Sequence, residues 1–345
     1  MNRKGLFTLK TITVEEHFES QLVTDLMTKV TGKPTVPSLS EDMLTYMRTT
    51  LPTSAIMQDV TKNRLNFMDQ NDIDMQILSY GNSQPQNMDP KFSIDICRVA
   101  NNELAKIVNE NPDRFGGLAV LPVGDPQAAA TELKRVVEDL GLNGVLFKGN
   151  YGGKYFDDPF FLPIFQMASD LDVPVYFHPS FIPNDIAQHY YANDNWSDVV
   201  TGILSSAGFG WHMDVGIQVM RMVISGIFDK LPNLKLVSGH WGELIPMFLE
   251  RLDDELTPYA GLKHPFSTYY RNNVYVTPSG ILAEPQLRFI LDEMGADHLL
   301  YSIDYPYKTP ENSGTFLETA RLTDEQREKI FHKNAETIFH LKGEK

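Results

Sequence analysis

The chain has 345 residues, and its hydrophobic content of 42% is enough to build the core of a barrel-sized domain. A net charge of −15 disfavours nucleic acid or an anionic membrane surface as a partner. The single cysteine, Cys97, excludes an intrachain disulfide and a cysteine-based zinc site. We expect a cytoplasmic protein, because no leader-like segment opens the sequence and no run of about 18 apolar residues occurs in it.

A first strand is predicted over residues 9–14, and a long segment without a clear strand, 19–71, follows it. This segment contains several X-Pro pairs with helical patches between them. A connection of this length is usually functional or an insertion, so we predict a cap over the mouth of the site. No internal repeat divides the sequence, and we predict one domain over residues 1–345 with the cap inside it.

After residue 71, apolar strand-like runs alternate with amphipathic helical segments. Further strands are predicted over 75–80, 116–122, 144–148, 174–178, 234–240, 274–278 and 299–304. Helices are predicted between them over 94–109, 126–140, 159–171, 213–228, 243–256 and 284–294. The strands are mainly apolar, which is typical of parallel strands covered by helices. The pattern predicts an α/β fold, a (β/α)8 TIM-type barrel, whose active sites lie at the C-terminal strand ends.

The first strand leads into two residues of metal-ligating type. Side chains alternate along a strand, so Glu15 and His17 point to one side and Glu16 to the other. A Glu-x-His pair alone is a weak signal for a metal site. It gains weight because three later predicted strands also end on such residues: His178, His240 and Asp304.

At the rim of a barrel, all these residues would converge, together with Lys148 at the end of the fourth strand. Two imidazoles and two carboxylates suit zinc, manganese or iron(II). The lysine has two interpretations from the residues alone, as a solvent-facing side chain or as a group beside the metal.

Five stretches resemble the metal-dependent amidohydrolase superfamily, in the branch that includes amino-carboxymuconate-semialdehyde decarboxylase. They are VEEHF (14–18), PVYFHP (174–179), SGIFDKLP (225–232), SGHWGE (238–243) and YSIDYP (301–306). The opening EEHF is most similar to γ-resorcylate and dihydroxybenzoate decarboxylases. The resemblance extends from residue 11 to about residue 341 and is weakest over 19–71.

The resemblance implies one divalent metal ion, zinc or manganese, and no organic cofactor. The implied ligands are Glu15, His17, His178 and Asp304. His240 would lie beside the metal, and Glu243, at the start of the next helix, would fix its tautomer. Arg251 on the same helix would hold the substrate anion. These roles for His240, Glu243 and Arg251 are expectations from the family.

The reaction implied by the resemblance is a non-oxidative decarboxylation, which makes the protein a carboxy-lyase acting on a small hydroxylated aromatic carboxylate. Asp304 would protonate the ring carbon that bears the carboxylate, and His240 would accept or relay the phenolic proton. Relatives form dimers and tetramers, so we expect a homodimer or a homotetramer.

Lys148 keeps an alternative open, because binuclear hydrolases of this fold carry a lysine carbamate at the end of strand four. The alternative is a metal-dependent hydrolase of a lactone or amide, and a third possibility is a barrel that only binds ligand. Glu-x-His in place of His-x-His favours the decarboxylase. In that case we expect the ammonium of Lys148 to pair with the substrate carboxylate or with an acid of the cap.

Other residues have a purely structural interpretation. Glu16 is expected to pair structurally, and Glu243 is alternatively a first-turn acid favoured by the helix dipole. Arg251 lies close in sequence to Asp253 and Asp254, which makes a surface salt bridge equally plausible. The histidines outside the strand ends are expected to be structural or exposed: His189, His212, His264, His298, His332 and His340.

Overall fold

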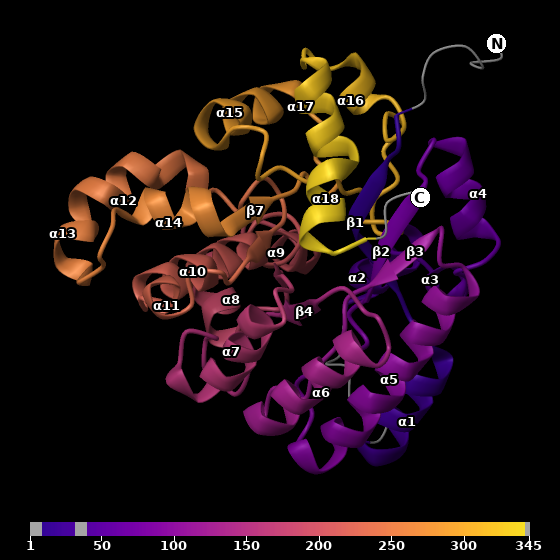
Figure 1. Ribbon diagram of the computed structural model, residues 1–345. Helices are drawn as coiled ribbons and strands as arrows, with labels where there is room; N and C mark the ends of the chain where they lie inside the picture. Colours follow the sequence, from indigo (N-terminus) through magenta and orange to yellow (C-terminus); the bar gives the residue numbers. More distant parts are fainter. Residues whose placement is uncertain (1–8, 32–39, 342–345) are drawn as a thin grey trace.

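The computed structural model describes residues 9–31 and 40–341. Strands lie at its centre and helices surround them (Figure 1). The strands are β1 (Ile12–Phe18), β2 (Met75–Tyr80), β3 (Phe115–Gly117), β4 (Val145–Lys148), β5 (Val175–His178), β6 (Leu236–Ser238) and β7 (Val274–Val276). Each lies where the sequence predicts a strand, although several are shorter than predicted.

All neighbouring strands are parallel, in the orders β1-β2-β3 and β4-β5-β6-β7. An eighth extended segment, 299–305, lies between β7 and β1. Single parallel bridges join these parts into a closed ring: Ala119–Val145, Val276–Leu299, Thr13–Tyr301 and Glu16–Tyr305. The predicted α/β barrel is therefore confirmed, and the polar ends of its strands meet at one rim.

Helices cover the outside of the ring. Those after β2 are α5 (Pro90–Glu110), α6 (Pro126–Glu138), α7 (Leu162–Asp170), α8 (Asn184–Tyr191), α9 (Asp198–Ser205), α10 (Gly210–Ile224), α11 (Ile227–Lys230), α12 (Leu249–Glu255), α13 (Thr257–Ala260), α14 (Phe266–Asn273), α15 (Glu284–Met294), α16 (Phe316–Thr319), α17 (Asp324–Glu328) and α18 (Asn334–Ile338). Shorter turns complete them: η1 (Pro159–Phe161), η2 (Ile245–Phe248) and η3 (Lys329–Lys333). None of the helices in the described ranges has the length and apolar character needed to cross a bilayer.

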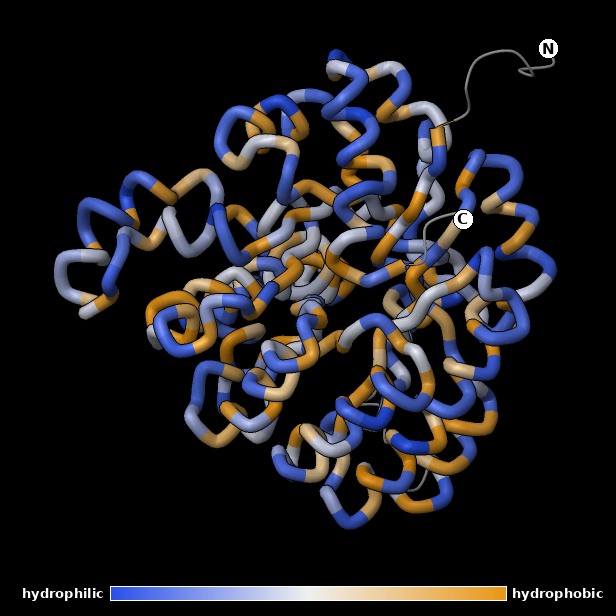
Figure 2. Tube along the Cα trace, in the orientation of Figure 1, coloured by the Kyte–Doolittle hydropathy of each residue, from blue (hydrophilic) through white to orange (hydrophobic). Residues whose placement is uncertain are grey.

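Apolar side chains hold the helices against the barrel. In α5, Asp89 caps the first turn, Pro90 opens it, and one face buries Cys97, Ala100 and Leu104. Figure 2 shows the same alternation of hydrophobic and hydrophilic residues along the outer helices.

The end of the barrel opposite the strand C-termini is closed by α18. Its Ile338 and the following Phe339 join the apolar cluster of the barrel interior. Asn143, just before β4, donates a hydrogen bond to the carbonyl oxygen of Phe339 at 2.9 Å. Ligands therefore approach from the other rim.

The segment predicted as a cap contains helices in its described parts: α1 (Gln21–Thr31), α2 (Glu41–Thr50), α3 (Ser54–Gln58) and α4 (Asn63–Gln70). Residues 32–39 of this segment lie outside the described residues. α1 packs on α5, and α2 packs on α9, which lies in the connection between β5 and β6. That this segment covers the mouth of the site, and that residues 1–345 form one domain, stay predictions.

The first strand differs from its predicted bounds. It extends through Phe18, whereas the sequence predicted an end at residue 14. Pairing with β2 continues to Tyr80, with a shift of register between Thr13 and Glu16. The prediction stopped where charged residues begin, but every residue of this strand is buried.

Candidate active site

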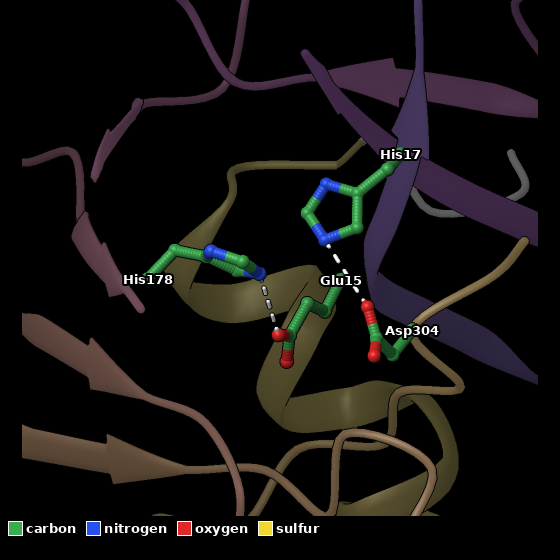
Figure 3. A group of neighbouring side chains, drawn as sticks. All are labelled: Glu15, His17, His178 and Asp304. Carbon is green, nitrogen blue, oxygen red and sulfur yellow. Dashed lines mark ion pairs between the residues drawn. The ribbon is translucent and has the colours of Figure 1, made fainter. Parts of the chain in front are cut away.

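Four side chains of metal-ligating type meet at the barrel rim. Figure 3 shows them converging from β1, from β5 and from the extended segment 299–305. Each offers one ligand atom, and these atoms all lie within 4.8 Å of one another. The four are the predicted metal ligands: Glu15, His17, His178 and Asp304.

The alternation along β1 places its three polar residues as predicted. Glu15 and His17 face the cluster, whereas Glu16 points the other way. The Glu16 carboxylate accepts hydrogen bonds from the backbone N–H groups of Ile303 at 3.0 Å and Tyr305 at 3.2 Å. Glu16 therefore ties the backbone on both sides of Asp304 to β1, which is the structural role expected for it.

Three buried atoms of the cluster have no hydrogen-bond partner: Glu15 Oε1, His17 Nε2 and His178 Nε2. Glu15 Oε1 lies 3.3 Å from His178 Nε2, and His17 Nε2 lies 3.3 Å from an oxygen of Asp304. Buried polar atoms without partners are rare in folded proteins because they are costly. A divalent cation between these atoms would satisfy all of them at once.

The opposite side of three of these candidate ligands is held in place. His178 Nδ1 donates to the carbonyl oxygen of Pro179 at 2.7 Å, which leaves Nε2 free to bind a metal. His17 Nδ1 lies 3.0 Å from Ser79 Oγ. Glu15 Oε2 accepts hydrogen bonds from the hydroxyls of Tyr176 and Ser279, so Oε1 faces the cluster.

The charges of the cluster also suit a cation. Burial lowers the pKa of His178 to about 4 and that of His17 well below its usual range, so both rings are neutral at pH 7. Burial raises the pKa of Glu15, but the nearby His240 and His178 outweigh it and bring the pKa to about 2. Burial and the Glu15 charge raise the pKa of Asp304 well above its usual range. A bound cation would lower it again.

Lys148 is buried beside this cluster and is not solvent-facing. It pairs in register with His178 across β4 and β5, and its Nζ lies 3.4 Å from Asn82 Oδ1. The side chain of Gln86 holds its backbone N–H and C=O, at 3.0 and 2.9 Å. Burial lowers the pKa of Lys148 to about 8, against the opposing charges of Asp304 and others.

A left-handed turn brings His240 and Glu243 together. Residues 240–244 have φ values of 48, 59, 79, 53 and 67°, and His240 Nδ1 lies 2.8 Å from Glu243 Oε1. The predicted contact is present, but the predicted position of Glu243 at a helix start is wrong, because helical structure begins at Ile245. Burial lowers the pKa of His240, but the Glu243 and Glu15 charges outweigh it and raise the pKa to about 9.

His212 is a site residue that the sequence analysis missed. It lies in the first turn of α10, and its Nδ1 is 3.0 Å from Glu243 Oε2. Its ring centroid is 4.2 Å from that of His240. No strand-end pattern marks this histidine, and only the fold of α10 against the turn after β6 brings it here.

Arg251 is placed outside the cluster. It lies on α12, where its side chain is largely exposed and pairs with Glu255 at 3.3 Å. The surface ion pair is thus formed, with Glu255 in place of the expected aspartates, since Asp253 accepts hydrogen bonds from Ser267. The chain itself does not bring Arg251 to the metal ligands, and its role in substrate binding stays a prediction.

Comparisons with known proteins agree with this geometry. The family model described as Amidohydrolase matches residues 56–341. The decarboxylase orsB of Emericella nidulans is 33% identical over 300 residues, which cover 84% of this chain and 88% of orsB. The γ-resorcylate decarboxylase of Rhodococcus jostii is 33% identical over 302 residues, which cover 83% of this chain and 89% of that enzyme.

A solved structure is similar to this protein over nearly the whole fold. The dihydroxybenzoic acid decarboxylase of Polaromonas sp. JS666, with bound manganese and the inhibitor 2-nitroresorcinol, superposes with a TM-score of 0.82 and 29% identity. The match covers 96% of this chain and 97% of that one. Together with the family match, these likenesses confirm the resemblance identified in the sequence. The chain belongs to the amidohydrolase family and, within it, to the amino-carboxymuconate-semialdehyde decarboxylase-like branch of decarboxylases.

Proposed function

We propose that this protein is a metal-dependent, non-oxidative decarboxylase of a hydroxylated aromatic carboxylic acid, similar to γ-resorcylate or a dihydroxybenzoate. The observation that carries the proposal is the buried cluster in which Glu15, His17 and His178 each keep one donor atom without a hydrogen bond. The relatives named above support the reaction type and the aromatic substrate.

The four clustered side chains would hold one divalent ion, zinc or manganese, and manganese is the ion bound in the Polaromonas enzyme. Bound there, the ion supplies positive charge that holds the substrate carboxylate and its neighbouring hydroxyl oxygen. No organic cofactor is part of the proposal.

Asp304 is the proposed acid. Burial and the charge of Glu15 favour its protonated form in the chain without metal, and its Oδ1 lies 3.3 Å from His17 Nε2. The Asp304 proton adds to the ring carbon that bears the carboxylate, which interrupts the aromatic system. The bond from that carbon to the carboxylate then breaks, its electron pair returns to the ring, and carbon dioxide leaves. Asp304 is left as a carboxylate and is reprotonated before the next turnover.

His240 is the proposed acceptor or relay of the phenolic proton, in the neutral form that a nearby bound cation would favour over the imidazolium. Glu243 holds its Nδ1 at 2.8 Å, which directs Nε2 away from Glu243. The same carboxylate stabilises the imidazolium that forms when the ring accepts a proton. A phenolate donates electron density to the ring and so favours protonation of the carbon.

Lys148 would contribute a positive charge beside the cluster. The acids whose charges act on it are Asp304, Glu15 and Glu19, the last of which begins the proposed cap. We propose that its ammonium pairs with the substrate carboxylate when substrate is bound and with Glu19 otherwise. The ring itself would contact side chains from residues 19–71, and we propose that the enzyme acts in the cytoplasm as a homodimer or homotetramer.

The test is to incubate the manganese-loaded and zinc-loaded protein with a panel of hydroxybenzoates and to measure released carbon dioxide. We expect release from acids with a hydroxyl next to the carboxylate and none from the isomers without one. Asp304→Asn is the matched control, since it keeps the shape of the side chain but cannot deliver the proton. If the protein instead hydrolysed lactones or amides and released no carbon dioxide from any acid, the result would favour the hydrolase.

A further inference from the structure

A second cluster of ligand-type side chains lies beside the first. Glu243 is almost fully buried, and its two carboxylate oxygens face two different imidazoles. Oε1 lies 2.8 Å from His240 Nδ1, and Oε2 lies 3.0 Å from His212 Nδ1. The two imidazoles also contact each other, with ring centroids 4.2 Å apart. Glu243 is thus held on both sides by histidine.

This cluster differs from the metal cluster in how its atoms are engaged. In the metal cluster, three buried donor atoms lack hydrogen-bond partners. In the second cluster, both Nδ1 atoms face carboxylate oxygens of Glu243 at hydrogen-bond distance. Atoms that already satisfy one another gain little from a cation. The arrangement therefore fits a hydrogen-bonded unit better than a second metal site.

The neighbours of His212 select its tautomer. The indole Nε1–H of Trp211 can only donate, and it lies 3.1 Å from His212 Nε2, which must then accept. A neutral ring with an acceptor at Nε2 carries its proton at Nδ1, where it donates to Glu243. The carbonyl oxygen of Ala207, also 3.1 Å from Nε2, would be a partner only if Nε2 carried a proton.

We propose that His212 is a positioning residue that locks the Glu243 carboxylate so that its other oxygen holds Nδ1 of His240. Glu243 itself lies in the left-handed turn, and its buried carboxylate is held by the hydrogen bonds to His240 and His212. With one oxygen held by His212, the carboxylate cannot rotate away from His240. This inference rests on the proposed role of His240 in decarboxylation.

The charges around the unit predict how it responds to loss of His212. Glu243 faces both histidines, and His240 is also influenced by Glu15 and Asp304. Without the His212 donor, the Glu243 charge acts on His240 alone. The pH limb of kcat that belongs to His240 is then expected to move to higher pH, and kcat is expected to fall about 10–100-fold, as for other orienting partners.

The test uses a pair of variants at one position. His212→Asn keeps an N–H donor near the place of Nδ1, whereas His212→Leu fills the space without one. We expect the Leu variant to lose about 10–100-fold in kcat with KM and metal content unchanged, and the Asn variant to recover most of the loss. His332→Gln is the control, because it removes a His–Glu contact of the same 3.0 Å length, to Glu336, in the C-terminal helices. Equal losses in Leu and Asn, or full activity in Leu, would overturn the proposal.

Nitrogen NMR of histidine side chains gives a readout that needs no substrate. In the unaltered protein, we expect His212 to carry its proton at Nδ1, and in His212→Leu we expect the His240 signals to change. A proton on Nε2 of His212, with Nδ1 bare, would refute the inference even if a variant failed to fold. If the NMR result is as expected but no hydroxybenzoate is decarboxylated, the proposed function fails while the positioning of His240 stands.

Discussion

Removal of the metal should lower the free energy of unfolding of the barrel. Three buried atoms, Glu15 Oε1, His17 Nε2 and His178 Nε2, lack hydrogen-bond partners. A buried polar group without a partner costs about 1–3 kcal/mol, so the three together cost about 3–9 kcal/mol, which a bound cation relieves. An ion at a hundredfold excess over its Kd stabilises the folded state by about 2.7 kcal/mol.

The stabilisation of about 2.7 kcal/mol converts to a shift of the melting temperature. An entropy of about 2.1 cal/mol/K per residue at the midpoint gives about 0.7 kcal/mol/K for 345 residues. Chelation should therefore lower Tm by about 4 °C relative to protein in a hundredfold excess of manganese over Kd. Thermal unfolding with manganese and with chelator measures this difference, and metal analysis gives the stoichiometry, for which we expect one ion per chain.

The control compares the metal-dependent shift within each variant and not the absolute Tm. His178→Ala should abolish the shift, because it removes one of the orphaned donors. His189→Ala, on α8, should keep it in full. A stoichiometry near zero that His178→Ala leaves unchanged, with no effect of chelator on Tm, would refute the assignment of the metal site.

Further predictions concern the residues around the metal. His240→Asn should retain the metal and lose about 10²–10⁴-fold in kcat, as expected for a positioned acid or base; an empty site in this variant would make His240 a ligand instead. Glu243→Gln should lose less, about 10–100-fold, and a larger loss than in His240→Asn would contradict its supporting role. Lys148→Met should raise KM with metal content intact, and loss of a second metal equivalent would favour the hydrolase. Because burial lowers the pKa of Lys148 to about 8, its charge is lost as pH rises through that value, so KM of the unaltered enzyme should rise there. A bound cation moves this limb to lower pH, and Lys148→Met should lack it.

The clustering of the four candidate metal ligands could be predicted from the sequence because the rule behind it is local. Strand alternation puts Glu15 and His17 on one face, and apolar runs mark the strands that end on His178 and precede Asp304. The closed barrel followed from the same runs. The bounds of β1 were missed, because charged residues in a strand normally signal exposure, whereas these are buried by their pairing with β2 and with the last segment.

Contacts that depend on backbone geometry or on distant packing could not be predicted. Residues of the turn at 240–244 other than Gly242 have no sequence signal for the left-handed region, so the helix was predicted to begin too early. His212 directly precedes the helix predicted over 213–228, and its contact with Glu243 is made by packing across 31 positions of the chain. Arg251 was assigned by resemblance, and its exposure depends on the orientation of α12.

The seam between β1 and the segment 299–305 has a consequence for how the protein is made. Val14 and His17 donate backbone hydrogen bonds to the carbonyl oxygens of Tyr301 and Tyr305, at 3.0 and 2.7 Å. A growing polypeptide on the ribosome therefore carries β1 with one edge unpaired until residues 299–305 have emerged, and such an edge is prone to pair with other chains. Asp304 is synthesised last among the four proposed metal ligands, so the ion can be held by all four only after this segment has emerged. Metal capture would then mark the completion of folding, and nascent chains halted before this segment would be candidates for aggregation and degradation.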